Sequence, residues 1–270
     1  SVIGHSPLAG VSGAASGDSG PLYVDDVFST FLYTASGSTQ TITNGIDLAG
    51  KGGMVWIKNR ANGGSYTNHT VVDSERIGSN GHESLYPNLT EPEFNPTSTS
   101  NAVVTSFSSN GFTRGGNLNV SNSSGDYVSW TFRKQSKFFD VVTYTGTGSN
   151  QIISHSLGSV PGMIMIHCRD GTHDWEVYHR STGATKSLHL NENHGQATDS
   201  TVWNNTTPTS SVFTVGTSSN VNQNGHGYVA YVFAHDEQAF GADEDEAIIK
   251  CGSYTGNNST NGPEINLGFE

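Results

Sequence analysis

Two stretches decide how this chain folds: Tyr127-Val128-Ser129-Trp130-Thr131-Phe132 and, 101 residues later, Tyr228-Val229-Ala230-Tyr231-Val232-Phe233. In an extended strand, successive side chains point to opposite sides. The later stretch therefore has two apolar faces, with Tyr228, Ala230 and Val232 on one and Val229, Tyr231 and Phe233 on the other. A strand that is apolar on both faces is typical of the inside of a covered sheet.

Other strings recur at almost the same interval. Tyr33, Tyr144 and Tyr254 stand in similar contexts at intervals of 111 and 110 residues, and Gly53-Met54-Val55-Trp56-Ile57 matches Gly162-Met163-Ile164-Met165-Ile166 at 109. Self-similarity at a fixed period indicates a repeated structural unit. We therefore predict that the chain contains a duplication.

Each copy consists of short alternating runs separated by Gly, Asn, Ser and Pro, which predicts an all-β fold of tandem antiparallel β-sandwiches, jelly-roll-like in form. About 110 residues can bury a core of their own, so we expect independent sandwiches arranged as a rod. The predicted parts are a flexible Gly/Ser-rich amino-terminal arm (1–24), two β-sandwich repeats (25–135 and 136–236), an acidic linker (237–246) and the start of a third, truncated repeat (247–270). We expect the natural polypeptide to continue beyond Glu270.

The amino-terminal arm is rich in glycine and has few large apolar residues and no periodicity. Such a segment cannot bury enough surface to offset its ordering entropy by itself. Two interpretations stay open: a flexible leader, or an arm that becomes ordered on a partner. In the second case the anchoring residues would be Ser1, Val2, Ile3, Leu8 and Val11.

Composition and charge exclude several classes of protein. The 24 Asp and Glu residues outnumber the 12 Lys and Arg residues, and a net charge of −12 argues against nucleic-acid binding, which needs a basic face. No apolar stretch approaches the roughly 18 to 20 residues that span a bilayer, so we predict no membrane insertion. Cys168 and Cys251 stand in apolar runs, which favours small buried thiols over a disulfide bond.

The sequence shows no constellation typical of catalysis. It lacks a nucleophile elbow, a P-loop, a C-x-x-C pair and an H-E-x-x-H motif, so we predict a protein that is not an enzyme and binds no cofactor. Histidines gather at His189 and His194 and again within residues 167–173. Neither group has two ligands on one strand face, so we expect loop or surface histidines and no metal, a zinc or iron site being the alternative. The acidic run 243–246 is expected to be a solvated linker, since its spacing does not suit Ca²⁺.

One aromatic stretch offers a candidate contact surface for a ligand or receptor. Its residues are Trp175, Tyr178, His179 and Arg180, and the indole ring could stack on a sugar. The alternative is that the alternation turns Trp175, Val177 and His179 toward the core.

Several ordered strings carry a resemblance to a known family. They are Asp140-Val141-Val142-Thr143-Tyr144-Thr145-Gly146, Leu157-Gly158-Ser159-Val160-Pro161-Gly162-Met163-Ile164, Trp175-Glu176-Val177-Tyr178-His179-Arg180, Tyr228 to His235, and Cys251-Gly252-Ser253-Tyr254-Thr255-Gly256. Together they resemble a tandem-repeat β-domain of virion structural and tail-fibre-like proteins of marine tailed bacteriophages, including cyanophages. The resemblance covers residues 25–270 and implies a particle component with repeated β domains. It supplies no catalytic residues, and the insertion at Tyr86–Pro96 departs from the family's commoner form.

The resemblance implies a bacteriophage virion structural protein located on the surface of the extracellular particle. It would be a tail fibre or a fibre that decorates the capsid, used for host attachment. The expected partners are other virion proteins through the arm, further copies in a homo-oligomer such as a trimer, and a host-surface glycan or protein. The alternatives are a secreted carbohydrate-binding or adhesin module and, with less support, a polysaccharide depolymerase, for which no acid pair can be chosen.

Overall fold

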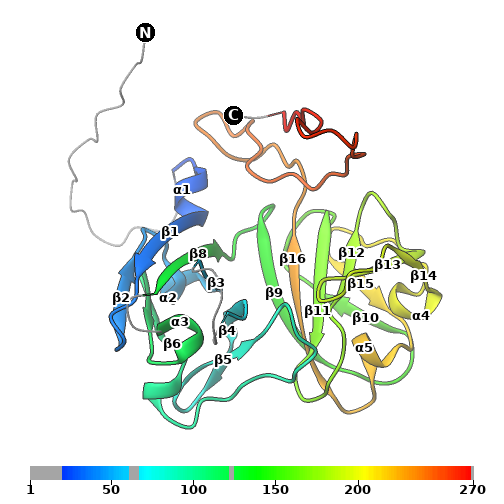
Figure 1. Cartoon of the computed structure of the whole chain (residues 1–270). Helices are drawn as coiled ribbons and strands as arrows, with labels where there is room; N and C mark the ends of the chain where they lie inside the picture. The colour runs from blue at the N-terminus through cyan, green and yellow to red at the C-terminus, as the bar shows by residue number, and fades with distance from the viewer. Residues whose placement is uncertain (1–19, 61–66, 122–124, 269–270) are drawn as a thin grey trace.

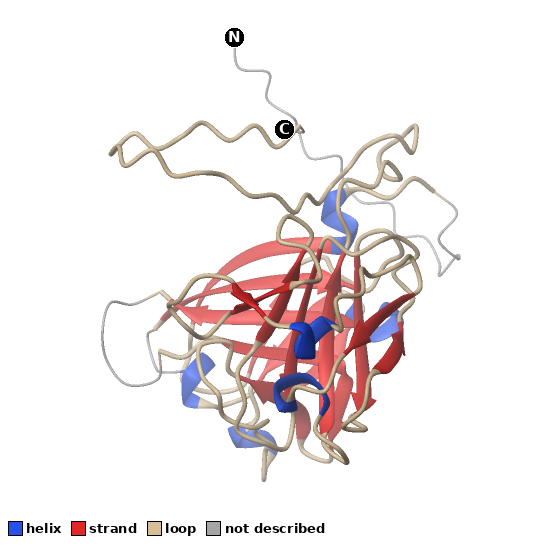
Figure 2. Ribbon diagram, turned by 90° about the vertical axis from the view of Figure 1, so that its right-hand side faces the viewer, coloured by secondary structure: helices blue, strands red, loops and turns tan. Residues whose placement is uncertain are grey.

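The computed structural model describes residues 20–60, 67–121 and 125–268. The anchoring residues proposed for the arm, Ser1, Val2, Ile3, Leu8 and Val11, lie outside this part of the chain. Nearly all of the regular structure is antiparallel β-sheet, and the helices have a single turn each. The prediction of a mainly β protein is therefore confirmed, with open sheets rather than a closed barrel (Figures 1 and 2).

The amino-terminal half contains a five-stranded sheet with the order β1-β8-β3-β4-β5 and a three-stranded sheet with the order β2-β7-β6. Its elements are α1 (Val24–Val27), β1 (Phe28–Thr34), β2 (Gln40–Thr43), α2 (Leu48–Lys51), β3 (Gly53–Asn59), β4 (Thr70–Gly78), β5 (Gly81–Leu85), the 3₁₀ turn η1 (Thr99–Asn101), β6 (Val104–Ser108), β7 (Gly111–Arg114), α3 (Leu118–Ser121) and β8 (Asp126–Arg133).

The carboxy-terminal half contains a six-stranded sheet with the order β14-β13-β12-β11-β16-β9 and a two-stranded sheet, β10-β15. Its elements are β9 (Phe139–Thr145), β10 (Gln151–Ser154), β11 (Met163–Cys168), β12 (Glu176–His179), β13 (Lys186–His189), β14 (Ala197–Thr198), α4 (Ser200–Trp203), β15 (Val212–Val215), α5 (Ser219–Asn222) and β16 (Gly227–Phe233).

The two halves have the same strand order. Read from the edge, β1-β8-β3-β4-β5 occupies the positions of β9-β16-β11-β12-β13, and the pair β2-β7 occupies those of β10-β15. The registers agree as well, because Tyr127 lies opposite Tyr33 just as Tyr228 lies opposite Tyr144.

A pair of stacked tyrosines recurs in each half. The rings of Tyr33 and Tyr127 are 5.3 Å apart and nearly parallel, and those of Tyr144 and Tyr228 are 5.2 Å apart. The hydroxyl of the first tyrosine donates to the Val120 carbonyl in one half and to the Val221 carbonyl in the other. Thus each pair ties the edge of a large sheet to the one-turn helix that precedes the inner strand.

Three apolar clusters lie between four β layers. One fills the space between the sheets of the first half, around Phe112, and another that of the second half, around Phe213. The third lies between the two large sheets and takes residues from both halves, including Met54, Phe139 and Trp175. The expectation of independent sandwiches in a rod is therefore corrected: the halves are packed face to face through a shared core.

The two-faced pattern of β16 agrees with this arrangement. Its pairing with β11 on one side and β9 on the other makes it an inner strand. Tyr228, Ala230 and Val232 enter the core of the second half, whereas Val229, Tyr231 and Phe233 enter the shared core. The predicted division of faces is confirmed.

A buried polar contact crosses the shared core. The guanidinium of Arg76 pairs with Asp73 at 2.7 Å, both on β4. The hydroxyl of Tyr231 on β16 donates to Asp73 Oδ2 at 2.7 Å and lies 3.0 Å from Arg76 Nη2. All three side chains are essentially inaccessible to water. A buried ion pair needs further hydrogen bonds to offset desolvation, and here the opposite half supplies one.

The insertion Tyr86–Pro96 docks on the second half. The backbone N–H of Glu93 donates to the Arg169 carbonyl at 2.7 Å, and that of His173 donates to the Thr90 carbonyl at 3.0 Å. The side chain of Arg169 in turn forms ion pairs with Glu83 and Glu93. The insertion thus forms a second, polar connection between the halves.

The predicted acidic linker is partly anchored. Its run 243–246 is exposed, as expected, but Phe240 is buried in the shared core and forms a β-bridge with Glu246. Beyond it, residues 247–268 contain no strand, although the Cys251 thiol is buried and its N–H donates to His235 Nδ1. A third copy beginning at residue 247 stays a prediction.

Replacing Tyr231 by Phe is expected to lower the free energy of unfolding by about 1 to 3 kcal/mol, since Asp73 and Arg76 would each lose a buried partner. Urea unfolding followed by circular dichroism measures the change. The matched control is Tyr254→Phe, whose ring is 70% exposed and which should leave stability unchanged. Equal, negligible effects of both substitutions would contradict a stabilising role for the contact.

Candidate functional site

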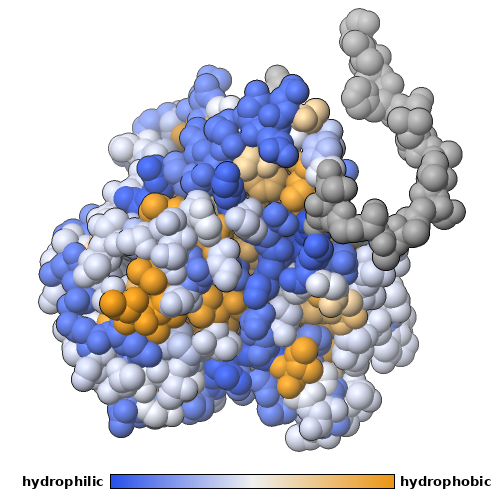
Figure 3. All heavy atoms as spheres, turned by 180° about the vertical axis from the view of Figure 1, so that it is seen from behind, coloured by the Kyte–Doolittle hydropathy of each residue, from blue (hydrophilic) through white to orange (hydrophobic). Residues whose placement is uncertain are grey.

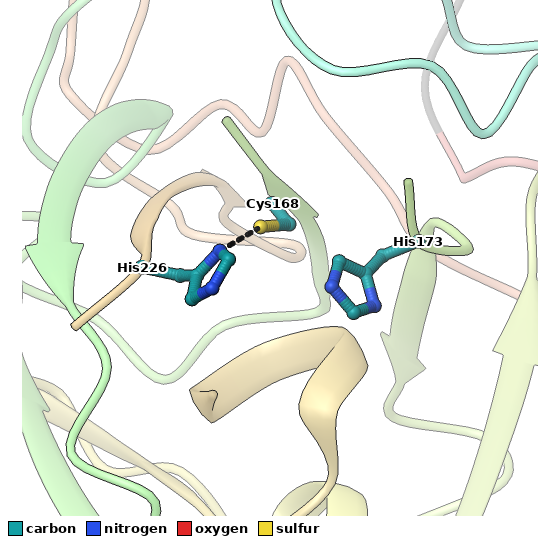
Figure 4. Close-up of side chains that lie close together, drawn as sticks. All are labelled: Cys168, His173 and His226. Carbon is teal, nitrogen blue, oxygen red and sulfur yellow. Dashed lines mark hydrogen bonds between the residues drawn. The ribbon is translucent and has the colours of Figure 1, made fainter. Parts of the chain in front are cut away.

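Three metal-ligating side chains meet where β11 ends and β16 begins. Cys168 is the last residue of β11, His226 directly precedes β16, and His173 lies in the loop between β11 and β12. Their potential ligand atoms all lie within 4.8 Å of one another. Figure 4 shows the two imidazole rings on either side of the Cys168 thiol, with Sγ 3.8 Å from Nδ1 of His226.

A carboxylate completes the group. Asp170 Oδ1 lies 2.8 Å from Nδ1 of His226 and 3.5 Å from Sγ of Cys168, and the N–H of Gly227 donates to its other oxygen at 3.1 Å. Burial of the carboxyl opposes its ionisation, but hydrogen bonds from Gly227, Cys168 and His226 lower the pKa of Asp170. A thiol and two imidazoles therefore lie close together, with an ionised carboxylate beside the thiol and one of the imidazoles.

A hydrogen-bond chain orients His173 within this group. Its Nδ1 lies 3.3 Å from the side-chain oxygen of Asn220, whose amide nitrogen donates to Glu176 at 2.8 Å. Because an amide oxygen only accepts, Nδ1 of His173 carries the proton and the lone pair is on Nε2. Nε2 of His173 and Sγ of Cys168 both lie close to Gly171, at 2.9 and 3.3 Å from the position that a Cβ would take there, and Figure 4 shows a ring nitrogen of His173 on the side of Cys168.

Glu176 anchors the far end of this chain. It is buried and also accepts hydrogen bonds from the Ser187 hydroxyl and from Nε2 of His189, the latter at 3.0 Å. The ring of His194 lies 5.1 Å from that of His189, but His194 is mostly exposed. The two predicted histidine groups are therefore joined through Asn220, with the metal-ligating atoms gathered in only one of them.

The same geometry does not suit a cysteine nucleophile. Cys168 is fully buried, and burial raises the pKa of its thiol, which disfavours the reactive thiolate. A Cys–His pair also needs the third group on the opposite ring nitrogen of the histidine. Here Cys168 and Asp170 both face Nδ1 of His226. The cluster is arranged to surround a common point rather than to relay a proton.

The predicted contact surface is mostly buried. Trp175 has no exposed area, stacks on Tyr231 at 6.2 Å, and donates from Nε1 to the Tyr86 carbonyl. Its ring is therefore unavailable to a sugar, and the stacking hypothesis is replaced by the alternative of a core residue. Tyr178 is buried as well, His179 is half-buried, and only Arg180 is exposed.

A hollow of about 390 Å³ includes part of that surface. Its lining includes Tyr178, Arg180, His235 and Glu237. These side chains place a cation, an imidazole and a carboxylate around its opening. We assign it no ligand.

Sequence reasoning named Cys168, Asp170 and His173 as a dense group but missed His226 and Asn220. His226 is 58 residues from Cys168, and only the pairing of β11 with β16 brings them together. Cys168 and His226 of the second half align with Asn59 and Gly125 of the first, so neither position carries the same residue type in both halves.

A family model described as a domain of unknown function, DUF7483, matches residues 24–270. The chain belongs to the DUF7483 family. One DUF7483 model spans both β-rich halves and the carboxy-terminal segment, so the family unit includes the pair of halves. No curated protein and no solved structure shows a significant match to this chain. Among the described residues of the DUF7483 domain, no helix has the length and hydropathy needed to cross a bilayer.

Removing the indole ring of Trp175 tests the assignment of this residue to the shared core. Trp175→Ala is expected to lower the free energy of unfolding by about 3 to 5 kcal/mol, because it leaves a cavity in the shared core. Arg180→Ala, at an exposed position five residues further on, should change it by less than about 0.5 kcal/mol. Thermal unfolding of both variants gives the comparison, and a stable Trp175→Ala protein would contradict the assignment.

Proposed function

We propose that this DUF7483 protein is a virion structural component, displayed on a tailed-phage particle as part of a fibre or appendage, and built from two copies of one β-sandwich. The observation that carries the proposal is the equivalence of the halves in strand order, register and stacked tyrosines. Repetition of a β unit is what the resemblance to phage fibre-like proteins implies.

The packing suits a particle component that must stay folded outside the cell. Four β layers enclose three apolar cores, and the halves are joined by the hydrogen bonds of Tyr231 to a buried ion pair and by a docked insertion. Local opening in such a body requires the separation of large apolar areas, so we expect resistance to proteolysis. A rigid body of this kind also holds its exposed loops at fixed positions, as host attachment requires.

The surface is consistent with display in water. Figure 3 shows a face that is mostly hydrophilic, with separate small hydrophobic patches. The net charge of −12 would keep neighbouring copies, and the acidic genome, apart. Partner contacts are assigned to the amino-terminal arm for the particle and to the loops for a host-surface glycan or protein.

The duplication makes a prediction about equivalent residues. Tyr33→Phe and Tyr144→Phe should each lower the free energy of unfolding by about 0.5 to 1.5 kcal/mol, because each removes one hydroxyl bond to a helix carbonyl. Tyr144→Phe should lower the free energy of unfolding by more than Tyr33→Phe, because the hydroxyl of Tyr144 lies 2.7 Å from its carbonyl partner and that of Tyr33 lies 3.4 Å from its own. Urea denaturation measures the free energy of unfolding of both variants. A decrease for only one of them would count against equivalent roles of the two tyrosines.

The proposed location of the protein on the virion is tested on phage particles. Antibodies against the purified chain, coupled to gold, should label intact virions at an appendage seen by negative-stain electron microscopy. Disruption of the gene should remove that appendage and the label while other structures persist. Particles that keep every appendage and shell feature after disruption would end the proposal.

A further inference from the structure

The geometry points to a structural zinc site in which Cys168, Asp170, His173 and His226 hold one Zn²⁺. This inference is independent of the proposed virion role, because it rests only on the ligand geometry. The set supplies one sulfur, two nitrogens and one oxygen, the donor types that Zn²⁺ takes in closed tetrahedral sites. Thiolate with imidazole also favours a borderline divalent ion over Mg²⁺ or Ca²⁺.

The distances between ligand atoms suit a tetrahedron. Bonds of about 2.0 to 2.3 Å from zinc place neighbouring ligand atoms roughly 3.3 to 3.7 Å apart. Here Asp170 Oδ1 lies 2.8 Å from His226 Nδ1 and 3.5 Å from Cys168 Sγ. The distance from Sγ to His226 Nδ1 is 3.8 Å. The ligand atoms of Cys168, His173 and His226 lie within 4.8 Å of one another. Asp170 Oδ1 lies beside the thiol and His226, and we assign it as the fourth ligand.

The surroundings hold the ligands in place. Asn220 fixes the tautomer and ring orientation of His173, and buried Glu176 fixes Asn220. The N–H of Gly227 fixes the second oxygen of Asp170. Outer partners of this kind orient the ligands in protein metal sites. The two anionic ligands, thiolate and carboxylate, neutralise the charge of the ion, and its binding releases the thiol proton of Cys168 to solvent.

The site belongs to the second half alone. In the first half Asn59 lies opposite Tyr127 where Cys168 lies opposite Tyr228, and Gly125 precedes β8 where His226 precedes β16. Neither Asn59 nor Gly125 supplies a thiolate or imidazole. An ion here would join the end of β11, the β11–β12 loop and the start of β16. The loop it holds also bonds to the insertion of the first half through the His173 N–H and the Arg169 carbonyl.

The test uses the full chain, stripped with a chelator and titrated with Zn²⁺ or Co²⁺ alone. We expect one zinc per chain by elemental analysis. Cobalt should give the visible bands of a tetrahedral site and a near-ultraviolet thiolate-to-cobalt charge-transfer band. A stoichiometry below about 0.1, or cobalt bound without the charge-transfer band, would overturn the inference whether or not any variant folds.

Matched variants locate the site. Cys168→Ser should abolish the charge-transfer band and the rise in melting temperature on adding zinc, and Cys251→Ser, at the other buried cysteine, should keep both. His173→Gln and His226→Gln should weaken zinc binding at least about 100-fold, and Asn220→Ala about 10- to 100-fold. His194→Gln, at an exposed histidine, should leave affinity unchanged. Undiminished zinc binding by folded Cys168→Ser would place the ion elsewhere and overturn the assignment.

Discussion

The apolar layer between the two large sheets is the constraint on which the rest of the molecule depends. Each large sheet already covers a smaller sheet with one face, so its other face would meet water if the halves separated. Packing these second faces together removes both from solvent and creates the shared core. The buried contact of Tyr231 with Asp73 and Arg76 then fixes how the faces are aligned, because a shift would leave buried polar groups unpaired.

Much of the β structure could be predicted from alternation and spacing. The two apolar faces of β16 are visible in residues 228–233, and the repeated tyrosines mark equivalent strands. What covers the second face could not be predicted. Alternation shows that Val229 and Tyr231 are buried, but it is equally compatible with a partner protein, another copy or the other half. The ion pair of Asp73 and Arg76 could not be predicted either, because the sequence pattern does not distinguish a buried charged pair from exposed charges.

The candidate site likewise has residues that the sequence could indicate and residues that only the fold brings together. Cys168 and His173 stand close in sequence and could be noticed, whereas His226 joins them only through the register of β11 with β16. Trp175 was ambiguous for a different reason. Its alternation with Val177 was compatible with a binding surface or a core, and the docked carbonyl of Tyr86, 89 residues away, decides for the core.

One backbone contact bears on how force would pass through the molecule. The Gly241 N–H donates to the Leu22 carbonyl at 2.8 Å, so the chain enters and leaves the β layers at neighbouring points. Tension applied to the chain before Leu22 and after Gly241 would load this hydrogen bond before it reached the strands of the sheets. The β layers would therefore bear force only after this bond, whereas domains connected in series would each bear it from the start.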